Sequence, residues 1–304
     1  MRLSLSILIV TISIFFSTGS SAQDTILHQG RKDIVLITST ASVYSGTMAA
    51  LYSTWYSQYE AQPFDFFNDR KEWRGMDKIG HFTTSWWASQ WINESLKLSG
   101  YSHRKARLWG TIVPLTFLTT VEVFDGFSSG WGFSYADMLA NVSGSAFFLS
   151  QDVLFAEQRF LLKYSFRKSG FSSIRPELLG SSYASAMLKD YNGQIYWLSV
   201  PLKSIVARQS EKFPGWLCLS LGYGAGGMLG GHDNLWSSDN MIYDYRSVKR
   251  HSEWYLSFDI DLKKLPIRGK AWKFFSSTFG FVKIPAPAFY WSGTNGFRFH
   301  PIYW

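Results

Sequence analysis

The spacing of apolar and polar positions divides the chain into two parts. From residue 34 to about residue 164 the apolar positions recur at helical spacing, and beyond residue 170 the period approaches two. Helices followed by strands are typical of an α+β protein. The pattern therefore predicts an N-terminal bundle of about four apolar helices and a C-terminal antiparallel, β-rich region.

Four helices are expected in the first part. Residues 34–59 carry no charge but are rich in Ser and Thr, so this helix is a marginal membrane span and a buried or membrane-abutting position is favoured. The others are expected at about residues 76–98, 104–124 with a kink at Pro114, and 134–163. The modest loops between them favour a bundle.

Five strands are expected in the second part, at residues 194–200, 216–223, 253–262, 274–284 and 296–304. In the third of these, apolar and polar residues alternate, which places one face of the sheet in an apolar setting. Aromatic residues make up 18% of the chain, which suits a protein at a membrane interface. An aromatic-rich core explains the same share, and both interpretations stay open.

The first residues have the order of a secretory signal peptide. Arg2 precedes an uncharged apolar run at residues 3–16, and small residues follow up to Ala22. We expect a signal peptide at residues 1–22, a helical domain at 23–165 and a strand-rich region at 166–304. No cysteine follows the apolar run, so a lipid anchor at a new N-terminal cysteine is not expected. The protein is expected on the periplasmic side of the cell envelope and in association with a membrane, for which the outer membrane is one candidate.

Charge and cysteine content narrow the partners. The chain has 30 Lys and Arg against 22 Asp and Glu, a net charge of +8, or +7 once Arg2 is removed. This excess favours membrane lipid head groups or cell-wall polymers, and nucleic acid is not expected as a partner of an exported chain. Cys218 is the only cysteine, so no internal disulfide is expected and stability must come from packing.

Three short stretches of the helical part carry polar residues that apolar helices normally avoid. The spacing of four residues places Asp77 with His81, and Asp137 with Asn141, on one face of their helices. Glu122 follows a charge-free run at residues 108–121, so its burial requires a cation, a proton or strong hydrogen bonds. The stretches contain Asp77, Lys78 and His81, then Glu122 and Asp125, then Ser134, Asp137, Asn141 and Gly144.

Structural roles compete with functional ones at most of these positions. Ser134 and Asp137 fit a helix-capping pattern, and Gly144 fits close helix packing. His81 alone is more often a satisfied core histidine. Asp125 is different, because an acid at a helix C-terminus faces the negative end of the dipole and requires a partner.

Together these side chains suit a mixed nitrogen and oxygen site for a divalent metal such as Zn, Mn or Mg. The expected ligands are Asp77, His81, Glu122 and Asp137. The expected catalytic set adds Asp125 as acid or base and Asn141 as a group that orients a ligand. The sequence has no HExxH, no Gly-x-Ser-x-Gly and no phosphate-binding Gly-Lys-Ser/Thr loop.

At these residues the chain resembles the YfiM-like family of uncharacterised bacterial envelope proteins, and it is distantly similar to VanZ-like membrane proteins. The matching stretches are Asp77-Lys78-x-x-His81, Glu122-x-x-Asp125-Gly126 and Ser134-x-x-Asp137-x-x-x-Asn141-x-x-Gly144. The resemblance covers about residues 64–158. It implies an envelope location but no established activity, and the strand-rich part goes beyond what VanZ-like proteins need.

Two functions follow as hypotheses. In the first, an exported cell-envelope protein uses a polar or metal-assisted site on lipid-linked or cell-wall material. In the second, the same residues form a buried ion-pair and capping network in a non-catalytic scaffold or outer-membrane-associated structural protein. A glycan-binding aromatic surface is a third reading.

Overall fold

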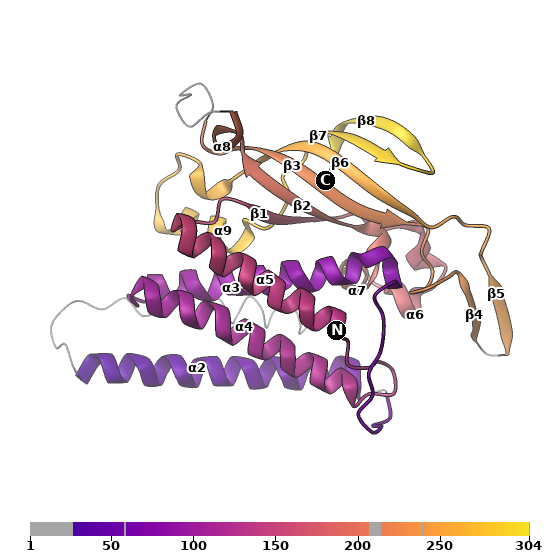
Figure 1. The fold of residues 1–304 in the computed structure, drawn as a ribbon, viewed down its shortest axis with the longest axis horizontal. Helices are drawn as coiled ribbons and strands as arrows, with labels where there is room; N and C mark the ends of the chain where they lie inside the picture. Colours follow the sequence, from indigo (N-terminus) through magenta and orange to yellow (C-terminus); the bar gives the residue numbers. More distant parts are fainter. Residues whose placement is uncertain (1–26, 58, 207–213, 239, 304) are drawn as a thin grey trace. The chain divides into compact units, whose positions relative to one another are not determined.

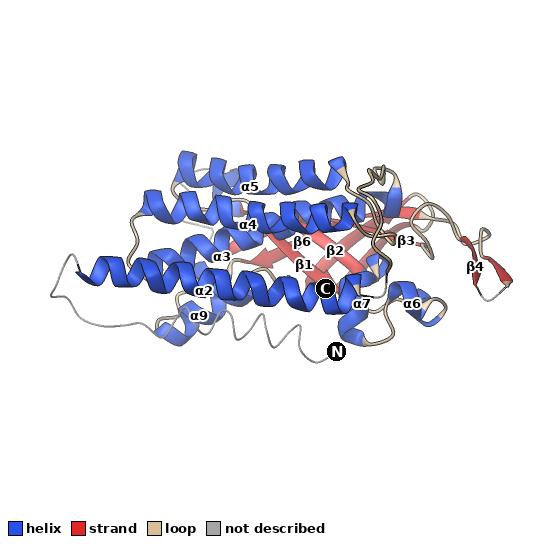
Figure 2. Ribbon diagram, turned by 90° about the horizontal axis from the view of Figure 1, so that it is seen from below, coloured by secondary structure: helices blue, strands red, loops and turns tan. Residues whose placement is uncertain are grey.

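The computed structural model describes residues 27–57, 59–206, 214–238 and 240–303. The expected signal peptide lies outside these residues, and so does the terminal Trp304. Helices occupy the first part of the described chain and strands the second, which confirms the α+β class (Figures 1 and 2). The chain divides into two compact units, one from Met1–Phe67 with Ser89–Met138 and one from Asn68–Ala88 with Leu139–Trp304.

The main helices are α2 (Leu27–Leu51), α3 (Met76–Leu98), α4 (His103–Gly126) and α5 (Tyr135–Phe155), with a π-helical turn η1 (Tyr52–Tyr56) after α2. Within the described part of the chain, no helix combines the length and the apolar character needed to cross a membrane. The minor helices are η2 (Glu72–Gly75), η3 (Gly170–Ser173), α6 (Pro176–Leu179), α7 (Tyr183–Lys189), η4 (Tyr191–Gly193), α8 (Leu202–Val206), η5 (Leu262–Lys264) and α9 (Lys270–Phe279).

The first unit is built from α2, α4 and the second part of α3. The Tyr44 ring meets Phe117 edge-on at 5.5 Å between centroids, and its hydroxyl bonds Thr120. Helix α4 also approaches α3 closely, because a Cβ at Gly110 would lie 2.9 Å from the Cβ of Asn93. Ser102 caps α4 by accepting a hydrogen bond from the backbone N–H of Lys105.

The second unit contains an antiparallel sheet of six strands in the order β1-β2-β3-β6-β7-β8. A separate hairpin pairs β4 with β5. The strands are β1 (Leu161–Phe166), β2 (Gln194–Pro201), β3 (Leu217–Gly226), β4 (Leu235–Ser238), β5 (Met241–Asp244), β6 (His251–Ile260), β7 (Ala286–Ser292) and β8 (Gly296–Tyr303).

Helices α3 and α5 cover the β1 and β2 end of this sheet. Trp86 from α3 and Phe148 from α5 pack with Leu161 and Leu162 of β1. The two helices meet at Gly144, where an added Cβ would lie 2.1 Å from the backbone oxygen of Phe82. The predicted close-packing role of Gly144 is therefore confirmed.

Two predicted elements differ from the structure, and strand β7 was not predicted. Helix α5 ends at Phe155 rather than near residue 163, because the Gln151 side chain accepts the backbone N–H groups of Arg159 and Phe160 and turns the chain into β1. The strand predicted at 274–284 is wrong, since α9 occupies most of it. Strand β7 is absent from the prediction because Pro287 lies inside it, and proline is unusual inside a sheet.

Candidate functional site

The site begins where the chain turns into α3. Three successive residues, Trp73, Arg74 and Gly75, adopt left-handed backbone angles with φ of 48°, 52° and 78°. This turn is held because the Trp73 N–H donates to the carbonyl of Gly231 at 2.9 Å and Tyr223 Oη donates to the carbonyl of Arg74 at 2.7 Å. The first turn of α3 is thereby fixed, and it presents Asp77 where the helix dipole favours a negative charge.

Asp77 lies at the centre of a charged network in the second unit. Lys78 Nζ is 2.8 Å from one oxygen of Asp77 and 2.5 Å from Asp69, so the lysine bridges two carboxylates. The hydroxyl of Tyr191 donates to the other oxygen of Asp77 at 2.6 Å. Burial raises the pKa of Asp77, but the charges of His81 and Lys78 and the hydrogen bonds outweigh it and hold the pKa below its usual value.

His81 connects this network to α5. Its Nδ1 lies 3.2 Å from Oδ1 of Asn141, and an amide oxygen only accepts, so Nδ1 carries the proton in this contact. The other ring nitrogen, Nε2, lies 3.8 Å from Asp77 Oδ1 and is the acceptor nitrogen of this tautomer, the one that binds a proton or a metal. One turn further along, Ser85 Oγ donates to the backbone oxygen of Asn141 at 2.7 Å and lies 2.8 Å from Ser145 Oγ.

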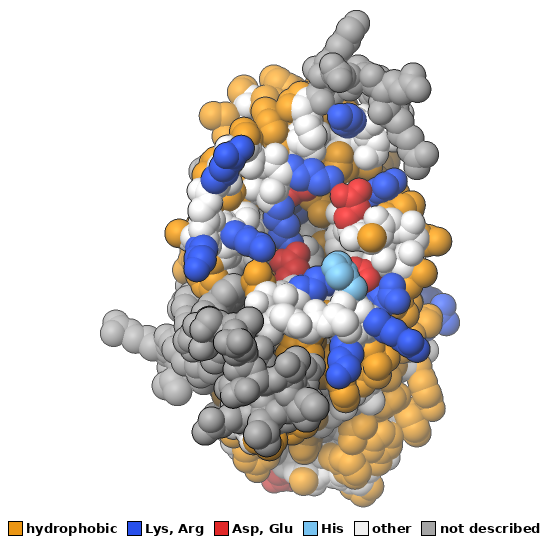
Figure 3. All heavy atoms as spheres, turned by 90° about the vertical axis from the view of Figure 1, so that its left-hand side faces the viewer, with side chains coloured by type: hydrophobic (Ala, Val, Ile, Leu, Met, Phe, Trp, Pro, Cys, Tyr) orange, Lys and Arg blue, Asp and Glu red, His pale blue; other side chains and the backbone are white. Residues whose placement is uncertain are grey.

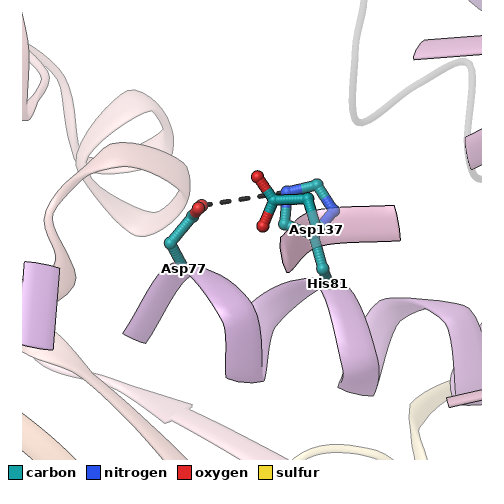
Figure 4. Close-up of side chains that lie close together, drawn as sticks. All are labelled: Asp77, His81 and Asp137. Carbon is teal, nitrogen blue, oxygen red and sulfur yellow. Dashed lines mark ion pairs between the residues drawn. The ribbon is translucent and has the colours of Figure 1, made fainter. Parts of the chain in front are cut away.

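Asp137 precedes Asn141 by one turn on α5 and is buried. Its backbone N–H donates to Ser134 Oγ at 3.1 Å, so the predicted capping contact is present. One ligand atom from each of Asp77, His81 and Asp137 lies within 4.8 Å of the others, and Figure 4 shows the three side chains turned toward one another. Ligands around an ion with bonds near 2 Å lie up to about 4 Å apart, so a small inward movement would close the site.

Glu122 and Asp125 lie on α4 in the first unit. Glu122 is only 1% exposed, so the compensation that burial demands applies to it. Asp125 has the partner that its place at a helix end requires, because Tyr56 Oη donates to it at 2.6 Å. Burial, followed by the charges of Asp125 and Glu122, raises the pKa of Tyr56. Within the described part of the chain, the group of three metal-ligand side chains contains neither acid, and their catalytic or ligand roles stay predictions.

Asp69 and Tyr191 belong to the network but were not predicted. Asp69 stands in an aromatic, polar linker, where an acid is unremarkable, and Tyr191 is 114 positions from Asp77. No spacing rule connects residues so far apart, so only the fold shows the contact.

Comparison with known proteins finds a match to one protein family over part of the chain. Residues 65–151, less than a third of the chain, match the model of a family described as predicted periplasmic lipoprotein, a domain of unknown function (DUF2279). The matched segment includes Asp77, His81, Glu122, Asp137 and Asn141. No curated protein matches the chain, and no solved structure matches it.

This description agrees with an uncharacterised protein of the cell envelope on its periplasmic side. The resemblances to YfiM-like and VanZ-like proteins stay predictions. The cysteine of this chain, Cys218, is buried on β3, and burial raises the pKa of its thiol to about 12.

Proposed function

We propose that this chain is an envelope protein that binds a divalent cation at Asp77, His81 and Asp137 and acts there on lipid-linked or cell-wall material. The observation that carries the proposal is the approach of the three ligand atoms to within 4.8 Å. One imidazole nitrogen with two carboxylates is a donor set that Zn and Mn accept readily.

The charge of the network also supports a cation. Asp69, Asp77 and Asp137 carry three formal negative charges against one positive charge on Lys78, while His81 is counted as neutral. With His81 in the neutral form that binds a metal, these five side chains sum to −2, so a divalent cation would meet favourable charge there.

A bound cation would polarise a phosphoryl or carbonyl oxygen, or lower the pKa of a water molecule. The surrounding residues suit the accompanying steps: Asn141 would orient a ligand beside His81, and the Tyr191 hydroxyl would offer a proton close to Asp77. An envelope location has no ATP pool, so hydrolysis or transfer between lipid-linked groups is favoured over phosphorylation by a nucleotide.

The second candidate is a non-catalytic scaffold. The specific observation in its favour is that Lys78 already bridges Asp69 and Asp77 at 2.5 and 2.8 Å. In that case the network holds α3 against the linker without a metal, and the sheet provides the working surface. An outer-membrane-associated structural role fits this candidate.

Elemental analysis of the purified mature protein, followed by calorimetric titration with Zn²⁺, Mn²⁺ and Mg²⁺, separates the two. We expect bound metal in the wild type and loss of most of it in His81→Ala. His251→Ala is the matched control, because His251 also pairs with an acid, Glu253 at 3.1 Å, but lies on β6. Absence of metal in the wild type, or an equal loss in both variants, contradicts the proposal and favours the scaffold.

A further inference from the structure

One face of the sheet in the second unit is apolar and open. Along β6, β7 and β8 its side chains form pairs that follow the strand register, such as Leu256 with Phe289 and Trp254 with Trp291. These residues are between 42% and 67% exposed. We call this surface the open face, and it consists of Trp254, Leu256, Phe289, Trp291, Phe297 and Phe299.

The open face is continuous. Phe289 packs against Phe297 and Phe299 with ring centroids 5.6 and 5.2 Å apart, so the rings of β7 and β8 touch. The same side of the sheet is covered by helices at its other end, where Leu162 and Leu198 pack with Trp86 and Phe148. The apolar side of the sheet is thus covered by helices at β1 and β2 and is exposed at β6, β7 and β8.

The opposite face is buried and carries charged side chains as well as an aromatic cluster. There Lys163 Nζ lies 2.9 Å from Asp259, and both side chains are 0% exposed. Lys283 is equally buried and donates to the carbonyls of Phe258 and Ile284 at 2.7 Å. A sheet in water normally places its apolar side inward and its polar side outward. This sheet buries an ion pair together with Trp197, Tyr255 and Tyr290 on one face and exposes the aromatics of the open face, which is the arrangement expected where the outer medium is hydrocarbon.

The positive charge of the C-terminal segment indicates that the open face binds an anionic partner. Residues 262–304 contain seven Lys and Arg and no Asp or Glu, and all of the seven except Lys283 lie outside the buried core. Helix α9 in this segment carries Lys270 and Lys273 and exposes Phe275 and Phe279, one turn apart. Figure 3 shows one face of the molecule, on which Lys and Arg side chains stand among hydrophobic ones and a few acidic ones. Basic residues beside aromatic ones favour anionic lipid head groups.

We propose that the open face, with the basic C-terminal segment that holds four of its six residues, docks into an anionic phospholipid bilayer. Trp254 and Trp291 are neighbours across β6 and β7 and take the interfacial position that indole rings prefer. The inference goes beyond the proposed metal site and does not depend on it, since no ligand residue lies on the open face.

Vesicle flotation with the full chain tests the surface. Wild-type protein should float with vesicles of phosphatidylethanolamine and phosphatidylglycerol, and much less with neutral phosphatidylcholine. Trp254→Ser/Trp291→Ser/Phe297→Ser should lower the bound fraction by at least about tenfold, because interfacial aromatics carry much of such binding. The matched control is Met241→Ser/Ile242→Ser, which removes two side chains of β5 that are 56% and 77% exposed and lie outside the six-stranded sheet.

A fluorescent label makes the test independent of the stability of that variant. Cys218 is buried with a raised thiol pKa, so an environment-sensitive dye reacts at an introduced cysteine. Dye at Phe297→Cys should shift to the blue on adding anionic vesicles, and dye at Ile242→Cys should not. The proposal is overturned if both positions respond alike, if flotation is the same for all variants, or if the open face is instead buried in a dimer seen by sedimentation.

Discussion

Gly144 offers the sharpest test of how the site is held together. An alanine there would place its Cβ 2.1 Å from the backbone oxygen of Phe82 and 2.9 Å from the Cβ of Ser85. Real Cβ atoms essentially never approach closer than 3.0 Å, so α3 and α5 would have to separate by about 0.9 Å. Backbone atoms cannot rotate aside as a flexible side chain would.

The cost can be worked out from the contacts. Overpacking of this kind costs about 1–3 kcal/mol. The same movement stretches the buried hydrogen bond of 2.7 Å from Ser85 to the backbone of Asn141, which is worth about 1 kcal/mol. Replacing a helical glycine returns up to about 1 kcal/mol. We expect a net loss of roughly 1–3 kcal/mol.

The assay is thermal unfolding followed by circular dichroism, together with metal titration. For a chain of this size each kcal/mol lowers the midpoint by about 2–4 °C, so Gly144→Ala should unfold about 2–12 °C below the wild type. Gly46→Ala is the control, because Gly46 lies within α2 with nothing within 4 Å of an added Cβ, and it should be neutral or stabilising. If Gly144→Ala melts at or above the wild-type midpoint, the reasoning about close helix contact is refuted.

Two further predictions concern pH. The pKa of Asp77 lies below its usual value. The stability that Asp77 contributes is therefore present above the unfolded pKa of about 3.9 and is lost as the pH falls through the folded pKa. Urea midpoints of Asp77→Asn should depend less on acid than those of the wild type, and parallel curves would contradict this. Burial lowers the pKa of Lys283 to about 8, so the unfolded chain binds more protons above that pH and stability should rise toward pH ~10, by up to roughly 3 kcal/mol for a shift of this size. This rise in stability should vanish in Lys283→Met. It is best measured in a Cys218→Ala background, since the raised pKa of the Cys218 thiol makes stability fall with pH over a similar range. A rise that persists in Lys283→Met would assign it to another group.

Local sequence patterns predicted those helices whose ends are marked by a capping or terminating residue. Helix α3 has the predicted bounds because Gly100 stops it with a left-handed φ of 86°. Strand β1 was missed because its run of apolar residues follows the helical pattern directly. The sequence predicts a strand over the second half of α9, since its aromatic residues favour a strand locally and the buried Ser276 gives no sign of an apolar helix face.

The site divides in the same way. Spacing of four residues predicted that Asp77 would share a face with His81, and Asp137 with Asn141, because that relation depends on one helix alone. The contact of His81 with Asn141 depends on two helices, and it arises where Gly144 lets them approach. The bond from Tyr191 to Asp77 depends on the sheet returning the chain to α3, which no local pattern encodes.

The Lys78→Met variant separates the metal-binding function from the scaffold function. The measurement that does so is its response to metal, because a change in stability alone is expected in both cases. Replacing it by Met leaves Asp69 and Asp77 without their shared cation, which destabilises the fold whether or not a metal binds. The metal response of Lys78→Met is different in the two cases. If the site binds a divalent ion, removing the competing ammonium should raise the affinity, and added Zn²⁺ or Mn²⁺ should restore part of the lost melting temperature. If the network is a scaffold, the loss should stay the same at every metal concentration. The same titration in Lys78→Met/His81→Ala completes the comparison, because a metal-dependent rescue must disappear when its nitrogen ligand is removed.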